Sequence, residues 1–305
     1  MGKVAFIFSG QGGQYSGMGN DLYENSPAAR EIFDVSERLR PDTLRQCFEG
    51  TAEELKETKN TQPDIYTVSL AAAAALESAG VRADVLAGFS VGEITALTFS
   101  GAVDRETGFD LVTRRGALMQ AAGEERPGVM AAVFKLERAQ VEALAAAYEN
   151  VFPVNYNCPG QIVVSGAPDE LEMFKADVKD AGGKAVQLKV SGSFHTPFMA
   201  SAAAGFEKIL TDVNIEPPRI PLYANRTGRP YEGSFKELLV EQVINPVLWQ
   251  DIMEHMIASG VDTFIECGPG KTLSGFVDRL SADVAIYNVE DMASLEETLK
   301  GVAQC

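Results

Sequence analysis

Short apolar runs alternate with longer stretches of helical periodicity along most of this chain. Residues 4–8 and 85–87 are wholly apolar, and each leads into a glycine-rich segment. Apolar runs of this length that end in turn signals are typical of strands buried on both faces. Further strands are expected at residues 220–225, 261–267 and 284–289. Helices are expected at residues 21–40, 64–79, 105–122, 237–244 and 246–258. This alternation predicts an α/β fold.

Proline and glycine set several of the expected boundaries. The helix at 64–79 is expected to start after Pro63 and to end at Gly80, because proline favours the first turn of a helix and glycine favours its end. A helix and the short strand at 284–289 are expected to finish the fold.

Residues 124–192 follow a rhythm of their own. Four strands and two helices succeed one another in the order βαββαβ, which is the ferredoxin-like pattern. The strands are expected at 128–134, 151–155, 161–165 and 184–190, and the helices at 136–148 and 168–181. We therefore expect a small subdomain at 124–192, inserted into a large domain formed by 1–123 and 193–305. A cleft between the two bodies is the expected place for a ligand.

The segment 88–92 carries the strongest chemical signal. It reads Gly-Phe-Ser-Val-Gly and joins the strand at 85–87 to a helix, which is the context of a nucleophile elbow. Such a turn places Ser90 in a strained conformation over the sheet edge. The N–H of Val91 lies at the start of the helix and would face a developing oxyanion. The alternative is an ordinary strand-turn-helix with two convenient glycines.

A nucleophilic serine needs a base, and the chain has two histidines. His255 lies in a segment of helical periodicity, where a surface histidine is the simpler interpretation. His195 lies in a glycine-broken loop after a strand, and loops of this kind often carry catalytic groups. We expect His195 to be the base, with a purely structural histidine as the alternative.

Two further segments leave their roles open at this stage. Residues 270–272 resemble the end of a P-loop, but Ile265 stands where that pattern requires glycine. The loop at 9–19 is rich in glycine, but Tyr15 stands where the dinucleotide-binding pattern requires glycine. The loop either brings backbone close to a ligand or is a plain connection. Arg114 and Arg115 point about 100° apart on one helix, so at most one of them is expected to face a site and bind a carboxylate.

Composition excludes several classes of function. The chain has 305 residues with a formal net charge of −17, which opposes nucleic acid as a partner and requires a local basic patch for any acidic one. The four cysteines show neither metal-ligand nor redox spacing, which favours reduced thiols in the cytoplasm. We expect neither a membrane span nor a signal peptide, since no apolar run is long enough.

Several motifs together resemble one family, the malonyl-CoA:acyl carrier protein transacylases of fatty acid synthesis, with the related acyltransferase domains of polyketide synthases. The resemblance covers nearly the full length. The motifs that carry it lie at residues 8–12, 88–93, 115–120, 155–161, 194–195, 245–249 and 266–270. It implies a hydrolase-like α/β body with a parallel-sheet core and an inserted ferredoxin-like subdomain.

The resemblance also implies roles for individual residues. Ser90 would be the nucleophile and His195 its base, with the N–H groups of Gln11 and Val91 as the oxyanion hole. Arg115 would bind the free carboxylate of a malonyl group. A backbone carbonyl in the segment from Asn245 to Leu248 would orient the histidine.

Two aromatic residues would shape the acyl pocket. The family's elbow usually carries histidine before the serine, and here Phe89 leaves the site more apolar. Phe194 resembles the malonyl-selecting pattern, because an aromatic ring leaves little room for a branched substrate. Ping-pong transfer from malonyl-CoA to acyl carrier protein would require no metal or redox cofactor, and the family is mostly monomeric.

Three alternatives stay open from the sequence. A trans-acting polyketide acyltransferase would share the chemistry and differ in its carrier protein. A serine esterase or thioesterase would share the elbow but would not need an arginine at 115. A non-catalytic scaffold would be expected to lack Ser90 or His195. For a carrier-docking patch the candidates are Lys184, Lys189, Arg226 and Arg229, each of which could equally be solvated surface.

Overall fold

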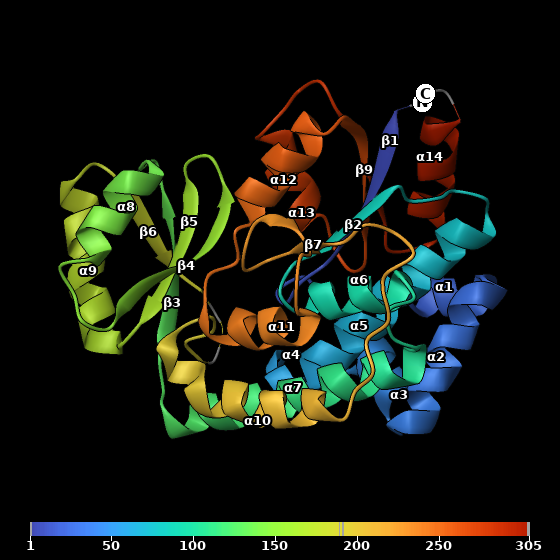
Figure 1. The fold of residues 1–305 in the computed structure, drawn as a ribbon, viewed down its shortest axis with the longest axis horizontal. Helices are drawn as coiled ribbons and strands as arrows, with labels where there is room; N and C mark the ends of the chain where they lie inside the picture. The colour runs from blue at the N-terminus through green and yellow to red at the C-terminus, as the bar shows by residue number, and fades with distance from the viewer. Residues whose placement is uncertain (1, 189, 191, 304–305) are drawn as a thin grey trace.

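The computed structural model describes residues 2–188, 190 and 192–303. It is built around a four-stranded parallel sheet with the strand order β10-β9-β1-β2 (Figure 1). Its strands are β1 (Lys3–Phe8), β2 (Val85–Gly88), β9 (Val261–Cys267) and β10 (Ala285–Val289). The apolar runs predicted to be buried strands are thus central to the fold, since β1 lies between β2 and β9.

Alternate residues of β1 face opposite sides of this sheet. Phe6 and Phe8 pack into one apolar cluster, and Ala5 and Ile7 pack into another. A strand buried on both faces needs apolar side chains at every position, which explains its uninterrupted run.

Helices cover both faces of the sheet. The larger cluster, on the side of Phe6, joins the sheet to α5 (Thr58–Ser78), α6 (Val91–Phe99), α7 (Arg105–Glu125), α10 (Ala200–Thr211) and α11 (Phe235–Ile244). The other cluster joins it to α12 (Trp249–Ala258) and α13 (Thr272–Asp278). The rest of this body comprises α1 (Asn20–Asn25), α2 (Pro27–Leu39), α3 (Thr43–Glu49), α4 (Ala52–Lys56), the 3₁₀ helix Pro197–Met199, β7 (Tyr223–Ala224), β8 (Arg229–Pro230) and α14 (Met292–Val302).

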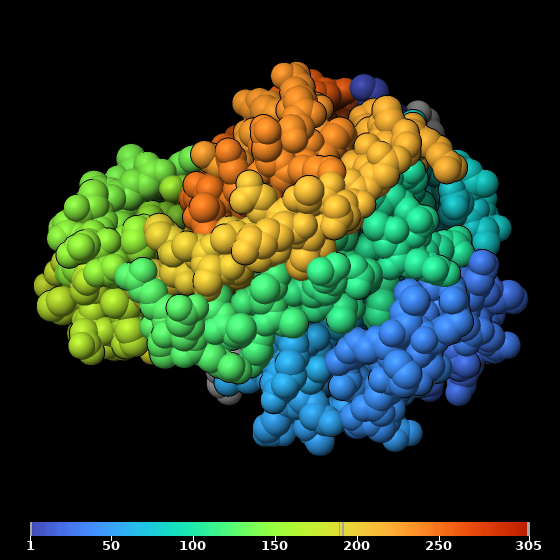
Figure 2. Space-filling view, turned by 60° about the horizontal axis from the view of Figure 1, so that its bottom comes forward, coloured from blue at the N-terminus to red at the C-terminus, as the bar shows by residue number. Residues whose placement is uncertain are grey.

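A second, antiparallel sheet has the strand order β4-β5-β3-β6. Its elements are β3 (Val129–Phe134), α8 (Arg138–Ala145), β4 (Val151–Cys158), β5 (Gln161–Gly166), α9 (Pro168–Asp180) and β6 (Lys184–Gln187). They form a lobe at one end of the molecule (Figures 1 and 2). The predicted fold class is confirmed, and all six elements fall within residues 124–192. We retain the predicted domain boundaries as a proposal.

Four local predictions differ from the structure. The helix expected at 21–40 is two helices, because Ser26 accepts a hydrogen bond from the N–H of Ala29 and Pro27 occupies the first position of α2. The helix expected at 64–79 begins six residues earlier, and Pro63 lies inside α5. Within 220–225, a strand is formed only by the two residues of β7, next to the single bridge from Leu222 to Leu86. After β10, α14 ends the described part of the chain.

No helix in the described ranges is long and apolar enough to cross a membrane.

Candidate active site

Ser90 lies at the turn between β2 and α6. Its backbone has φ 54° and ψ −107°, a positive-φ conformation that is costly for a residue other than glycine. A Cβ on Gly88 would lie 1.8 Å from the carbonyl oxygen of Gly92, and a Cβ on Gly92 would lie 2.3 Å from that of Phe8. Both glycines are therefore required by the close approach of the backbone. The N–H of Ser90 donates to Asn225 Oδ1 at 2.7 Å, which helps to hold the turn.

His195 meets the hydroxyl of this serine. Its Nε2 lies 2.9 Å from Ser90 Oγ, and its Nδ1 lies 2.7 Å from the backbone oxygen of Gln242. Because a carbonyl only accepts hydrogen bonds, Nδ1 carries the proton and Nε2 is free to accept one from the serine. The pair has the geometry of an activated nucleophile.

The carbonyl that orients His195 belongs to Gln242, so the predicted segment from Asn245 to Leu248 is corrected. Gln242 lies in the last turn of α11, where carbonyl groups have no partner within the helix. The backbone of Asn245 contributes a smaller interaction with His195. Leu248 instead precedes α12 and donates its N–H to the carbonyl of Asn225.

Burial keeps His195 neutral. The side chain is 4% exposed, and burial, followed by the positive charge of Arg115, lowers the pKa of His195 to about 4. The hydrogen bond to Gln242 opposes these two effects. At neutral pH the imidazole is therefore unprotonated and can accept the serine proton.

The two residues expected to form an oxyanion hole line one small cavity with Ser90. Val91 is the first residue of α6, so its N–H has no acceptor within that helix. Gln11 lies in the loop after β1, and its side chain donates to Thr58 Oγ1 at 3.4 Å. The cavity has a volume of about 80 Å³. It is lined by Gln11, Gln62, Phe89, Ser90, Val91, Met119, Met130, Asn155, Leu188, Val190, Phe194 and His195.

Arg115, on α7, is the arginine that faces the site, while Arg114 is exposed and pairs with Asp110. The guanidinium of Arg115 donates to Gln62 Oε1 and Gln242 Oε1, both at 2.7 Å. Its Nη2 also lies 3.3 Å from Ser90 Oγ.

Its hydrogen-bond acceptors are uncharged, and its Nε has no hydrogen-bond partner in the described part of the chain. Burial lowers the pKa of Arg115 to about 10, so it remains charged at neutral pH. A buried arginine without a direct carboxylate partner is well suited to bind one from a ligand.

Three polar residues of the site were not singled out from the sequence: Gln62, Asn225 and Gln242. Gln242 shares the buried face of α11 with Leu239 and Val243, at helical spacing. A polar side chain at an apolar position is the signal that could have revealed it.

Phe89 lines two cavities: the cavity of about 80 Å³ that contains Ser90, called the inner cavity, and a second one, called the outer cavity. Its ring packs against Trp249 at 5.4 Å and against Phe276 at 6.5 Å between centroids. The outer cavity has a volume of about 210 Å³ and shares Gln11, Phe89, Asn155 and Leu188 with the inner one. Asn155 and Asn157 both line it, and the buried Oδ1 of each has no hydrogen-bond partner among the described residues.

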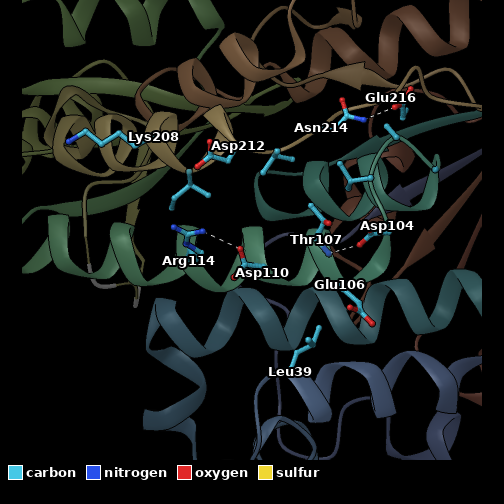
Figure 3. A pocket seen from close by; sticks show the side chains of 15 residues that line it. Leu39, Asp104, Glu106, Thr107, Asp110, Arg114, Lys208, Asp212, Asn214 and Glu216 are labelled. Carbon is cyan, nitrogen blue, oxygen red and sulfur yellow. Dashed lines mark hydrogen bonds and ion pairs between the residues drawn. The ribbon is translucent and has the colours of Figure 1, made fainter.

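Larger cavities lie elsewhere in the described chain. A groove of about 650 Å³ runs between α7 and α10 and is lined by several acidic side chains, among them Asp110 and Asp212 (Figure 3). None of the predicted site residues lines it. Within the described ranges, no group of three or more acidic, histidine or cysteine side chains could hold a metal ion.

The remaining candidates lie outside the site. His255 is on α12, where its Nδ1 lies 2.6 Å from the hydroxyl of Tyr223. Lys184 begins β6, Arg226 pairs with Glu241 at 3.2 Å, and Arg229 donates to the carbonyl of Gly228. Lys189 lies outside the described residues.

Comparison with known proteins agrees with this geometry. The sequence profile of the acyl transferase domain family matches residues 5–295. The chain is 37% identical over 314 residues to the malonyl CoA-acyl carrier protein transacylase of Bacillus subtilis, with 98% of each protein covered. It is 38% identical over 282 residues to the polyketide biosynthesis protein ThaF of Burkholderia thailandensis, covering 90% of this chain and 24% of that protein.

Solved structures give the same result. The malonyl CoA-acyl carrier protein transacylase of Clostridium perfringens superposes with a TM-score of 0.96 at 40% identity, covering 99% of this chain and 98% of that one. A type II polyketide synthase acyl-carrier protein in complex with its malonyl-transacylase includes a chain that superposes with a TM-score of 0.94 at 31% identity, covering 98% of this chain and 99% of that one. The resemblance seen in the sequence is confirmed: the chain belongs to the acyl transferase domain family.

Proposed function

We propose that the chain transfers a malonyl group from malonyl-CoA to the phosphopantetheine thiol of acyl carrier protein, through a malonyl ester on Ser90, and so supplies fatty acid chain elongation. The observation that carries the proposal is the distance of 3.3 Å between Arg115 Nη2 and the hydroxyl that His195 activates. Two relatives that align with this chain over nearly their full length are named malonyl CoA-acyl carrier protein transacylase.

In the first half-reaction, His195 Nε2 takes the proton of Ser90 as Oγ attacks the thioester carbonyl of malonyl-CoA. The N–H groups of Val91 and Gln11 stabilise the oxyanion, and each such donor contributes roughly 10²- to 10³-fold in rate. Coenzyme A leaves with the proton from His195. The malonyl carboxylate pairs with Arg115, which holds the acyl group in one orientation.

In the second half-reaction, His195 takes the proton of the pantetheine thiol as the sulfur attacks the ester carbonyl. The bond between that carbonyl and Ser90 Oγ then breaks, Oγ takes the proton back from His195, and the malonyl group remains on the pantetheine sulfur. The outer cavity would receive the pantetheine arm of either substrate. The unpartnered Oδ1 atoms of Asn155 and Asn157 would accept hydrogen bonds from its two amide N–H groups. The reaction as proposed uses no metal or redox cofactor, and we propose a monomer that acts in the cytoplasm.

Intact-protein mass spectrometry tests the proposal. Mixing with malonyl-CoA should add one malonyl group, and holo acyl carrier protein should then remove it and gain the group itself. The Ser90→Ala variant should show neither step. Release of free malonate without a carrier, and without a stable adduct, would instead favour a hydrolase.

A trans-acting polyketide acyltransferase is the second candidate. The relative from Burkholderia thailandensis is named as a polyketide biosynthesis protein. Parallel transfer rates to fatty acid and polyketide carrier proteins separate the two, because both candidates form the same ester on Ser90.

A further inference from the structure

Glu93 ends the elbow motif at 88–93, and the mechanism above gives it no part. It lies on α6, one turn after Ser90, and its side chain is fully buried. Burying a carboxylate is costly, because its charge is removed from water and several hydrogen bonds are needed to compensate.

The carboxylate of Glu93 is surrounded by hydrogen-bond donors. Gln242 Nε2 donates to Oε2 at 2.6 Å, the N–H of Asn225 donates to Oε1 at 3.3 Å, and the hydroxyl of Tyr231 donates to Oε1. A protonated carboxyl group would turn one of its oxygens into a donor facing another donor. The arrangement therefore fits the ionised form.

Gln242 transmits the position of this carboxylate to the site. Its Oε1 accepts from Arg115, and its Nε2 donates both to Glu93 and to the backbone oxygen of Ser90 at 2.9 Å. Because Arg115 can only donate, the amide of Gln242 must turn its oxygen to Arg115 and its nitrogen to Glu93. The backbone oxygen of the same residue holds His195.

Glu93 also supplies a negative charge that acts on Arg115 through space, since the amide of Gln242 bonds to both. Its charge is what stabilises the protonated guanidinium against burial. A direct ion pair would occupy the atoms of Arg115 that a ligand needs. With the amide of Gln242 between the two charges, Arg115 remains charged and its side towards Ser90 stays open.

We propose that Glu93 is a positioning residue for acyl transfer, whose buried carboxylate fixes Gln242 and thereby sets Arg115 to receive a substrate carboxylate beside Ser90. The inference rests on the proposed function and assigns a role to a residue that does not touch the reacting atoms.

The pH dependence of this arrangement gives a direct readout. Burial raises the pKa of Glu93 to about 7, while the groups that face it, Tyr231, Gln242, Asn225 and the charge of Arg115, lower it. Protonation as pH falls would break the bond to Gln242. In the parent enzyme, the rate of malonyl transfer should therefore increase as pH rises, with an apparent pKa near neutrality.

The decisive variant is Glu93→Gln, which keeps the shape and removes the charge. We expect malonyl loading to fall roughly 10- to 100-fold, the malonyl-to-acetyl loading ratio to fall, and the rate to become flat with pH from about 5 to 8. Glu106→Gln makes the same chemical change at an exposed residue that pairs with Arg38, and it should behave as the parent.

Tyr231→Phe provides a second test should Glu93→Gln fold poorly. It leaves the carboxylate with one donor fewer, so the apparent pKa of loading should move to higher pH. A Glu93→Gln enzyme within twofold of the parent, with the same acid limb, would overturn the inference. The inference would also be overturned if thermal melting showed that the loss of malonyl loading in Glu93→Gln equals the loss of folded protein. A parent that forms no malonyl ester would contradict the proposed function instead.

Discussion

The guanidinium of Arg115 lies 3.3 Å from the hydroxyl of Ser90, which also lies 2.9 Å from Nε2 of His195. One cation therefore faces both the nucleophile and the place where an acyl group must be held once it is attached. The charge has two consequences that can be separated experimentally. In the proposed function it attracts a carboxylate on the substrate, and it lowers the basicity of the nearby imidazole.

The first consequence predicts the choice of acyl donor. Arg115→Ala should reduce malonyl loading of Ser90 by roughly 100-fold or more, because a charged hydrogen-bonded pair is lost. Acetyl loading should be retained or should rise, since acetyl-CoA carries no acyl carboxylate. Arg114→Ala is the matched control, because Arg114 is exposed and pairs with the exposed Asp110. An equal loss with both donors would refute the role of Arg115.

The second consequence predicts a shift in the pH profile with acetyl-CoA. The positive charge of Arg115 is the second cause, after burial, of the lowered pKa of His195. Arg115→Gln removes that charge, so the pKa of His195 should rise. Since the base must be neutral to act, the acid limb of acetyl loading should move to higher pH. Stopped-flow measurement of loading from pH 4 to 8 would show it, and an unchanged limb would contradict the electrostatic coupling.

The elbow could be predicted from sequence because its constraints are local. Gly88 and Gly92 are required by contacts within a few residues of Ser90 and with the end of the adjacent strand β1. His195 could be found because the chain offers only two histidines. The hydrogen-bond network behind them could not be found in this way. Gln242 lies 152 residues from Ser90, and only the folded chain brings its side chain within hydrogen-bond distance of the Ser90 backbone oxygen.

The predicted helix boundaries were wrong where local helix propensity and tertiary contacts disagree. Proline usually begins a helix, and the sequence places Pro63 at such a start. In the structure the preceding turn is held by the bond from the N–H of Thr58 to the side chain of Gln120 on α7. This contact between distant segments stabilises a turn that the local sequence alone does not predict.

The close contacts at the elbow predict a large effect of one methyl group. Gly92→Ala should abolish loading and lower the yield of folded protein, because the new Cβ would lie 2.3 Å from a backbone oxygen that cannot move. Gly275→Ala is the control, since a Cβ there meets nothing within 4 Å and the residue is helical. Circular dichroism and thermal melting would compare the two, and a Gly92→Ala protein with normal stability and activity would contradict the strained turn.

A buried acid that does not line the candidate site predicts a pH-dependent stability. Asp64 on α5 is fully buried, neither of its carboxylate oxygens has a hydrogen-bond partner among the described residues, and Arg40 is 3.7 Å away. Burial raises the pKa of Asp64 to about 7. A raised folded-state pKa contributes stability below the unfolded pKa, and this stability is lost as pH rises towards 7.

Asp64→Asn should therefore gain stability relative to the parent between about pH 4 and pH 8, by up to about 4 kcal/mol at roughly 1.4 kcal/mol per pKa unit. Urea unfolding at several pH values measures the difference. Asp110→Asn, at an exposed position, should show no such trend. If the free energies of unfolding of Asp64→Asn and the parent differed by the same amount at every pH in this range, the pKa of Asp64 would not change on folding.

The aromatic residues around the inner cavity predict the size of acyl group accepted. Phe194 is 7% exposed and lines the cavity of about 80 Å³ that contains Ser90, so its ring limits the space beside the ester. Phe194→Ala should raise loading from methylmalonyl-CoA relative to malonyl-CoA by roughly 10-fold or more, a typical discrimination for one methyl group in a closed pocket.

Phe89→His is the comparison, since Phe89 packs towards Trp249 and should alter the outer cavity more than the acyl site. Competition between the two donors, followed by intact mass of the acyl-enzyme, measures both ratios. If Phe89→His changed the preference and Phe194→Ala did not, the residue that limits the acyl branch would be Phe89, and the malonyl-selecting role of Phe194 would be wrong.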